Sequence, residues 1–156
     1  MCIRDRFSAG GVVLKNEDVT VTAALVPHPP VSPAFGYRFD AADRSIVISG
    51  DTAYSEAVVA LAKDADVLVH EAMYRPGIER LAQRIGNGTR LLEHLHAAHT
   101  VTEDVGRVAA AAKVKLLVLS HLVPGDDPAI TEEMWIAGAR QHYDGPIVVG
   151  RDLLEI

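Results

Sequence analysis

Residues 102–121 read TEDVGRVAAAAKVKLLVLSH, and this stretch decides the fold class. Its first part predicts a helix over Thr102–Lys113, because acidic side chains in the first turn suit the helix dipole and a run of alanines follows. The helix leads into an apolar strand over Val114–Leu119 that ends at His121. An apolar run without alternation is typical of a strand covered on both faces. A helix feeding such a strand predicts an α/β fold.

The rest of the chain extends this pattern in both directions. Helices are predicted over Ser55–Ala65, Ile78–Ile85, Thr89–His96 and Thr131–Tyr143, and further strands over Asp66–His70, Pro146–Val149 and Leu153–Ile156. The opening is richer in Val and Thr and predicts strands over Gly11–Lys15, Asp18–Val26, Phe35–Asp40 and Ser45–Ser49, the last two as a hairpin. Three prolines in residues 28–33 predict a fixed loop, because proline cannot donate to a strand ladder. We therefore expect a mixed sheet flanked by helices.

Length and composition narrow the function classes. The chain has 156 residues, one domain's worth, and a net charge of −6. An acidic chain with no basic cluster is a poor general nucleic-acid binder, since phosphate contacts supply most of that affinity. Cys2 is the single cysteine, so no internal disulfide forms and a cytoplasmic protein is expected. No apolar run reaches the roughly 18 residues that a membrane span needs.

Polar side chains with ligand chemistry follow three apolar strands, at the point where each strand ends. They are His28, Asp51 and His121. Strand ends of one sheet can converge on one edge, so residues distant in the sequence can meet there. Histidine and aspartate together suit a borderline metal such as zinc. The pairs His70-Glu71 and His99-Thr100 lie at two further element ends, and together these positions predict a metal site.

Each of these residues also has a purely structural interpretation. His28 could close a strand, and Asp51 could be a turn residue or the N-cap of the helix at Ser55. His121 and His70 could be buried histidines bonded to backbone, with Glu71 as a helix-start charge. His99 could sit at a helix end near the negative pole of the dipole. His94 and His96 face nearly opposite sides of one helix and, like His142, are interpreted as non-ligands.

The order of the motifs resembles a known family. The segments are HPPVSPAFGYR (28–38), SGDT (49–52), LVHEAM (68–73), AHT (98–100) and LSHL (119–122). This succession, from about Val19 to the end, resembles the C-terminal half of metallo-β-lactamase-fold hydrolases, and within them the ribonuclease Z and arylsulfatase-like branch. The resemblance implies a four-layer αββα sandwich truncated at its N-terminus. Residues 1–10 would be a disordered or foreign leader, and residues 11–156 the C-terminal half of the domain.

The resemblance also assigns roles at the site. It implies one or two divalent metals, commonly zinc, with His28 as a ligand of the first and His121 of the second. Asp51 would be the carboxylate that bridges both metals and would thereby take part in catalysis. His99 matches a catalytic histidine that assists the leaving group, while His70 and Glu71 would support the ligands from behind.

These roles imply metal-dependent hydrolysis of a phosphodiester or other ester by a metal-bound hydroxide. The family's other ligands come from a His-x-His-x-Asp-His motif upstream of His28, and none of the 27 residues before His28 is a histidine. Two zinc ions are therefore expected only in a full-length protein. This chain alone is expected to be inactive or to bind one metal weakly.

Two alternatives stay open. The first is a ribonuclease Z-like tRNA 3′ endonuclease, but that branch carries a long insertion where this chain has only Phe39–Ser49, and the net charge of −6 disfavours RNA. The second is a non-catalytic fragment that serves as a structural or dimerisation module. The expected partner is a small ester or phosphodiester substrate; RNA is disfavoured, a membrane is not expected, and a homodimer is allowed.

Overall fold

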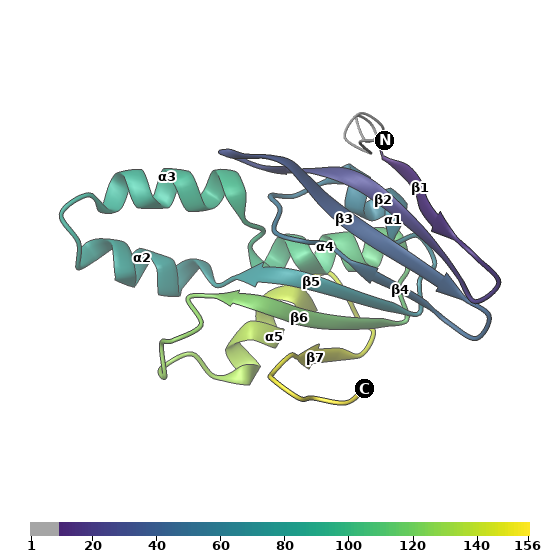
Figure 1. Ribbon diagram of the computed structural model, residues 1–156. Helices are drawn as coiled ribbons and strands as arrows, with labels where there is room; N and C mark the ends of the chain where they lie inside the picture. Colours follow the sequence, from purple (N-terminus) through teal and green to yellow (C-terminus); the bar gives the residue numbers. More distant parts are fainter. Residues whose placement is uncertain (1–9) are drawn as a thin grey trace.

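A computed structural model describes residues 10–156 and arranges them around one seven-stranded sheet (Figure 1). The strands lie side by side in chain order. They are β1 Gly11–Lys15, β2 Val19–His28, β3 Val31–Ala41, β4 Ser45–Ile48, β5 Val67–Met73, β6 Leu116–Val123 and β7 Ile147–Val149. The leader predicted for residues 1–10 lies, apart from Gly10, outside the described residues.

The sheet changes character at β4. Strands β1 to β4 form an antiparallel meander, whereas β4, β5, β6 and β7 are parallel neighbours joined by helical crossovers. The helices are α1 Glu56–Leu61, α2 Arg75–Gln83, α3 Gly88–Ala98, α4 Thr102–Ala112 and α5 Glu132–Arg140. This mixed sheet with flanking helices confirms the α/β fold class. None of the helices in residues 10–156 has the length and apolarity that a bilayer crossing requires.

The main core lies between one sheet face and the helices α1, α4 and α5. Val47, Leu68 and Leu117 point from neighbouring strands into a cluster that includes Val105 and Trp135 from the helices. Alternate strand residues point to the opposite face. There the cross-strand partners Tyr37 and Ile48 are 37% and 43% exposed. Within residues 10–156, this second face is apolar and carries no helix layer.

Helices α2 and α3 form a hairpin that extends beyond the ends of β5 and β6 (Figure 1). A small separate cluster of Met73, Ile78 and Val101 packs at its base, with Leu92 and Leu95 against it. The main chain closes the base, because Met73 N donates to the Thr100 carbonyl at 2.8 Å. The hairpin therefore enters and leaves the body of the fold at one place.

The proline-rich segment is not the loop that was predicted. Strand β2 continues to His28 and β3 begins at Val31, so only Pro29-Pro30 separates them. The pairing register shifts between Val26 and His28, where Pro27 of β2 lies opposite two residues of β3, Ser32 and Pro33. The hydrogen-bond ladder is interrupted at this bulge, and such interruptions are where a strand tolerates proline.

The closing strand predicted for Leu153–Ile156 is also absent, and β7 is the last strand of the described residues. The chain turns instead, with Leu154 N donating to the Arg151 carbonyl at 3.1 Å. Leu153 has a φ of 61° and is fully exposed. Apolar composition alone predicted a strand here, but this conformation is incompatible with one.

Candidate metal centre

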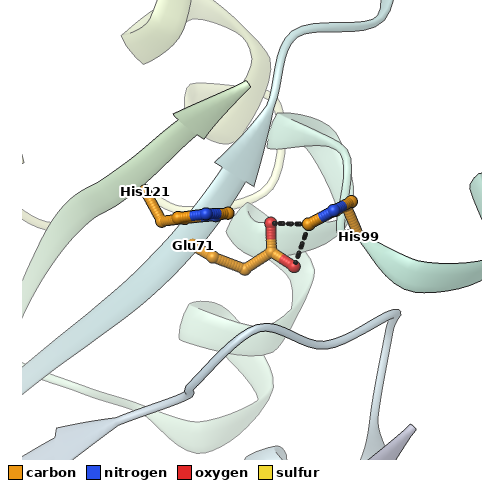
Figure 2. A group of neighbouring side chains, drawn as sticks. All are labelled: Glu71, His99 and His121. Atoms are coloured by element: carbon orange, nitrogen blue, oxygen red, sulfur yellow. Dashed lines mark hydrogen bonds and ion pairs between the residues drawn. The ribbon is translucent and has the colours of Figure 1, made fainter. Parts of the chain in front are cut away.

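The candidate residues come together at one edge of the sheet. Strands β2, β4, β5 and β6 all run in the same direction, so their carboxyl ends meet at this edge. Figure 2 shows Glu71, His99 and His121 pointing toward one another. Glu71 comes from β5, His121 from β6, and His99 follows α3 directly. His28 ends β2, and Asp51 follows β4 by three residues.

His121 is directed into the site by an irregularity in β6. Ser120 pairs with Glu71 and Leu122 with Ala72, so His121 is the extra residue of a bulge. Its φ is 41°, in the left-handed region that non-glycine residues seldom adopt. Such conformations cost about 1–3 kcal/mol and cluster at functional sites. The side chain is 50% exposed, so the interpretation of His121 as a buried histidine is wrong.

Asp51 is placed by the turn that follows β4. Gly50 has a φ of 64°, and a Cβ at that position would lie 2.5 Å from the Phe35 carbonyl oxygen, so this turn needs glycine. The turn is tied to β2, because Ala53 N donates to the Pro27 carbonyl at 2.8 Å. Asp51 Oδ1 then lies 3.6 Å from His121 Nδ1. Ser55, and not Asp51, is the N-cap of α1.

Glu71 is a buried carboxylate whose oxygens are hydrogen-bonded. Its side chain is 2% exposed. Thr52 N donates to Oε1 at 2.9 Å, and His99 Nδ1 lies 3.1 and 3.2 Å from the two carboxylate oxygens. The Glu71 main-chain N–H in turn donates to Ser49 Oγ at 3.1 Å. Burial of a charge is costly unless it is paired in this way.

His99 joins Glu71 to the other two histidines. Its hydrogen bond to Glu71 is the main cause that raises the pKa of His99 above its ordinary value. The His99 ring stacks on the His121 ring at a centroid distance of 5.5 Å, and the His28 ring meets it edge-on at 5.2 Å. Since Nδ1 donates to Glu71, Nε2 is the nitrogen left for other chemistry.

The donor set fits a divalent metal ion. Glu71, His99 and His121 each offer one ligand atom, and these atoms lie within 4.8 Å of one another. Ligand atoms around a tetrahedral zinc are about 3.3 Å apart, so the group is wider than a closed zinc site. Imidazole nitrogen with carboxylate oxygen is a typical zinc donor combination. A pocket of about 90 Å³ opens here, lined by Asp51, Glu71, Ser120 and His121 among others.

The geometry regroups the residues that the sequence singled out. The sequence interpretation joined His28, Asp51 and His121 as ligands and placed Glu71 behind them. In the structure Glu71 itself belongs to the group with His99 and His121. Asp51 lies next to His121, and His28 lies next to His99. Asp51, His99 and His121 therefore lie together, with His28 against His99.

His70 does not join this group. It alternates with Glu71 along β5 and so points to the helix-covered face of the sheet. The ring is fully buried, and burial lowers the pKa of His70. Its Nδ1 lies 2.7 Å from the Glu71 carbonyl, while Nε2 has no hydrogen-bond partner among the described residues. His94, His96 and His142 are all exposed and lie outside the site.

Two threonines to which the sequence interpretation gave no role support the site. Thr100 Oγ1 donates to the Thr52 carbonyl at 2.6 Å, and Thr52 N donates to Glu71. Both threonines are buried. Their positions beside Asp51 and His99, in Gly-Asp-Thr and Ala-His-Thr, were the available signal.

Thr100→Val is expected to lower the free energy of unfolding by about 1–3 kcal/mol, because the buried Thr52 carbonyl loses its hydroxyl donor while the side-chain volume is kept. Urea denaturation of the metal-free chain measures the loss. Thr89→Val, at an exposed position of α3, is the matched control and should change stability by less than about 0.5 kcal/mol. Equal stability of the two variants would contradict the support role of Thr100.

Comparison with known proteins adds a family match. The sequence profile of the Beta-lactamase superfamily domain matches residues 4–122. A ribonuclease Z of Mycobacterium tuberculosis is 31% identical over 143 residues, which are 92% of this chain and 50% of the relative. A ribonuclease Z of Mycobacterium sp. (strain KMS) is 34% identical over 143 residues, covering 92% of this chain and 48% of that protein. This chain thus spans about half the length of these curated relatives.

Solved structures share the fold. The metallo-beta-lactamase fold protein YhfI from Bacillus subtilis superposes with a TM-score of 0.65 at 19% identity, covering 88% of this chain and 49% of that protein. The short form of human tRNase Z superposes with a TM-score of 0.58 at 21% identity, covering 92% of this chain and 43% of the human protein. At these identities the similarity is one of fold.

Proposed function

This chain belongs to the beta-lactamase superfamily, and on that basis we propose that it is part of a metal-dependent hydrolase. The resemblance to metallo-β-lactamase-fold proteins, and to ribonuclease Z among them, is confirmed by the profile match and the relatives. The single observation that carries the proposal is the convergence of four side chains at one sheet edge: Asp51 Oδ1 lies 3.6 Å from His121 Nδ1, and the His99 ring contacts the rings of His121 and His28.

Residues 11–156 form the C-terminal half of the catalytic domain in this proposal. The uncovered sheet face supports it, because Tyr37 and Ile48 present apolar side chains where a sandwich would place its second sheet. The ligands that would complete two metal positions come from that other half. We also propose that the protein acts in the cytoplasm, because a single cysteine such as Cys2 is typical of proteins in a reducing compartment.

His28, Asp51 and His121 would hold the metal in the proposed site. A divalent metal bound there would lower the pKa of a coordinated water and polarise the ester or phosphodiester bond. Asp51 keeps its carboxylate beside His121, and its negative charge offsets the repulsion between the metal charges.

His99 provides the proton for the leaving oxygen. Its Nδ1 is held by Glu71, so the ring orientation is fixed and Nε2 is free to face the substrate. The hydrogen bond to Glu71 raises the pKa of His99, which keeps a larger fraction of the imidazole protonated near neutral pH. Glu71 is thus a positioning residue that acts through His99.

The proposed substrate class is a phosphodiester or other small ester. A second candidate, 3′ processing of tRNA, is favoured by the ribonuclease Z relatives. The net charge of −6 and the short β3–β4 connection weigh against a large RNA substrate. Hydrolysis of a chromogenic phosphodiester and of a precursor tRNA, by a protein carrying both halves of the domain, discriminates between the two.

Zinc titration of the chain tests the proposed metal site. After removal of metals with a chelator, calorimetry is expected to detect one zinc bound weakly per chain, and less tightly at lower pH because the ligand imidazoles become protonated. The His94→Ala/His96→Ala double variant, which removes two exposed histidines of α3, should bind zinc as the parent does. Two tightly bound zinc ions would contradict the half-domain proposal. No binding would favour a structural or dimerisation module.

A further inference from the structure

His28 makes a contact that determines which of its ring nitrogens is free. Its Nδ1 lies 2.9 Å from the carbonyl oxygen of Ala98, the last residue of α3. A carbonyl oxygen can only accept, so Nδ1 carries the hydrogen in this contact. In the neutral ring the lone pair then resides on Nε2, the atom that remains available to a metal ion.

The Ala98 carbonyl oxygen can accept this hydrogen bond because Ala98 is the last residue of α3. The last four carbonyls of an α-helix have no intrahelical N–H partner, and Ala98 carries one of them. The carboxyl end of a helix is also the negative end of its dipole, which favours an N–H donor there. The sequence therefore supplies an unused acceptor where α3 passes the end of β2.

The Ala98 carbonyl is held in place by contacts that do not involve His28. Two residues further on, Thr100 O accepts a hydrogen bond from Met73 N, and Thr100 Oγ1 donates to the Thr52 carbonyl. The His28 ring meets the His99 ring edge-on at 5.2 Å, and so lies beside the metal group. The backbone at the end of α3 is thus held by its own hydrogen bonds, and its Ala98 carbonyl orients the His28 ring.

We propose that the terminal carbonyl of α3 is the positioning group of His28: it fixes the tautomer and the ring orientation, and so leaves Nε2 as the nitrogen for the metal. This inference rests on the proposed function, because it presupposes a metal at the site. A ligand histidine whose other nitrogen donates to a carbonyl is more basic and better oriented, and loss of such a partner typically costs 10–100-fold in metal affinity. Residues 98 and 99 would then position one metal ligand and supply the proton donor from a single helix end.

The first test is spectroscopic and uses the whole chain. Two-bond proton–nitrogen correlation spectra of the chain with ¹⁵N-labelled histidine distinguish a protonated from an unprotonated ring nitrogen. The His28 signals are identified by their loss in His28→Gln. We expect Nδ1–H in the metal-free chain and a zinc-dependent shift of Nε2. An Nε2–H tautomer, or a zinc-dependent shift confined to Nδ1, would overturn the inference.

The second test compares two substitutions that mimic different ring nitrogens. The asparagine amide of His28→Asn occupies the place of Nδ1, so it keeps the bond to Ala98 but cannot reach the metal. The glutamine amide of His28→Gln reaches the place of Nε2. Zinc affinity should fall at least about 100-fold in His28→Asn, which loses a direct ligand, and less in His28→Gln, which keeps a donor atom at the place of Nε2; equal losses or the reverse order would refute the assignment. Absence of zinc-dependent shifts at every histidine would instead refute the proposed metal site, and the ligand role of His28 with it.

Discussion

Replacement of His99 by alanine is expected to lower the free energy of unfolding of the metal-free chain by about 3–5 kcal/mol, the range for a buried ion pair that loses one partner. The Glu71 side chain is 2% exposed and would lose the imidazole that lies beside both of its carboxylate oxygens. Urea denaturation in the presence of a chelator measures the difference.

The size of this loss should depend on pH. Glu71 raises the pKa of folded His99 above the unfolded value of about 6.5. The stabilisation from the pair is therefore fully present below that unfolded value and disappears as the pH rises through the raised one. The destabilisation by His99→Ala should accordingly be larger at about pH 6 than at about pH 9.

A double variant separates the unpaired charge from lost packing. Glu71→Gln removes the charge, so adding it to His99→Ala should recover part of the lost stability. His96→Ala is the matched control, because it removes an exposed imidazole near the end of the same helix and should cost less than about 0.5 kcal/mol. No recovery in the double variant, or equal losses for His96 and His99, would show that the Glu71 charge is not what His99 offsets.

His121→Ala is expected to weaken zinc binding by at least about 100-fold, because a direct ligand contributes more than the outer partners whose loss costs 10–100-fold. The side chain is 50% exposed and packs against little besides the neighbouring rings. The free energy of unfolding without metal should therefore change by less than about 0.5 kcal/mol. Calorimetric titration and urea denaturation of the same variant measure the two quantities separately.

The matched control for His121→Ala is His142→Ala, which removes an exposed histidine beyond the end of α5. It should leave zinc affinity unchanged. Unchanged affinity in His121→Ala itself would place the metal on other residues and remove Asp51 from the site, since Asp51 borders the group through His121.

The sequence was sufficient for the fold class and for the edge where the site lies. Apolar runs without alternation predicted β5 and β6, and parallel strands bring their carboxyl ends to one edge. His121 and Asp51 do lie 3.6 Å apart there, although 69 residues separate them in the chain. The hydrophobic pattern was enough to predict these strands, and the positions of Asp51 and His121 after strand ends were enough to place both at one edge.

The details of the site depend on tertiary geometry that a pattern does not carry. His121 faces the pocket because β6 bulges against β5, and a one-residue shift in register depends on both strands together. Glu71 was interpreted as a supporting residue because nothing in its local sequence indicates that Thr52 and His99 enclose it. Pro27 likewise lies in a strand because β3 bulges opposite it.

The hairpin of α2 and α3 separates two tasks along the chain. Glu71 precedes it in β5 and His99 follows it, and the main-chain bond from Met73 N to the Thr100 carbonyl joins the two ends of the hairpin. Residues 75–97 could therefore be lengthened or shortened without moving the site, provided that the Ala98 carbonyl at the end of α3 keeps its position. A change of length in that segment would therefore leave Glu71 and His99 at the same distance from each other.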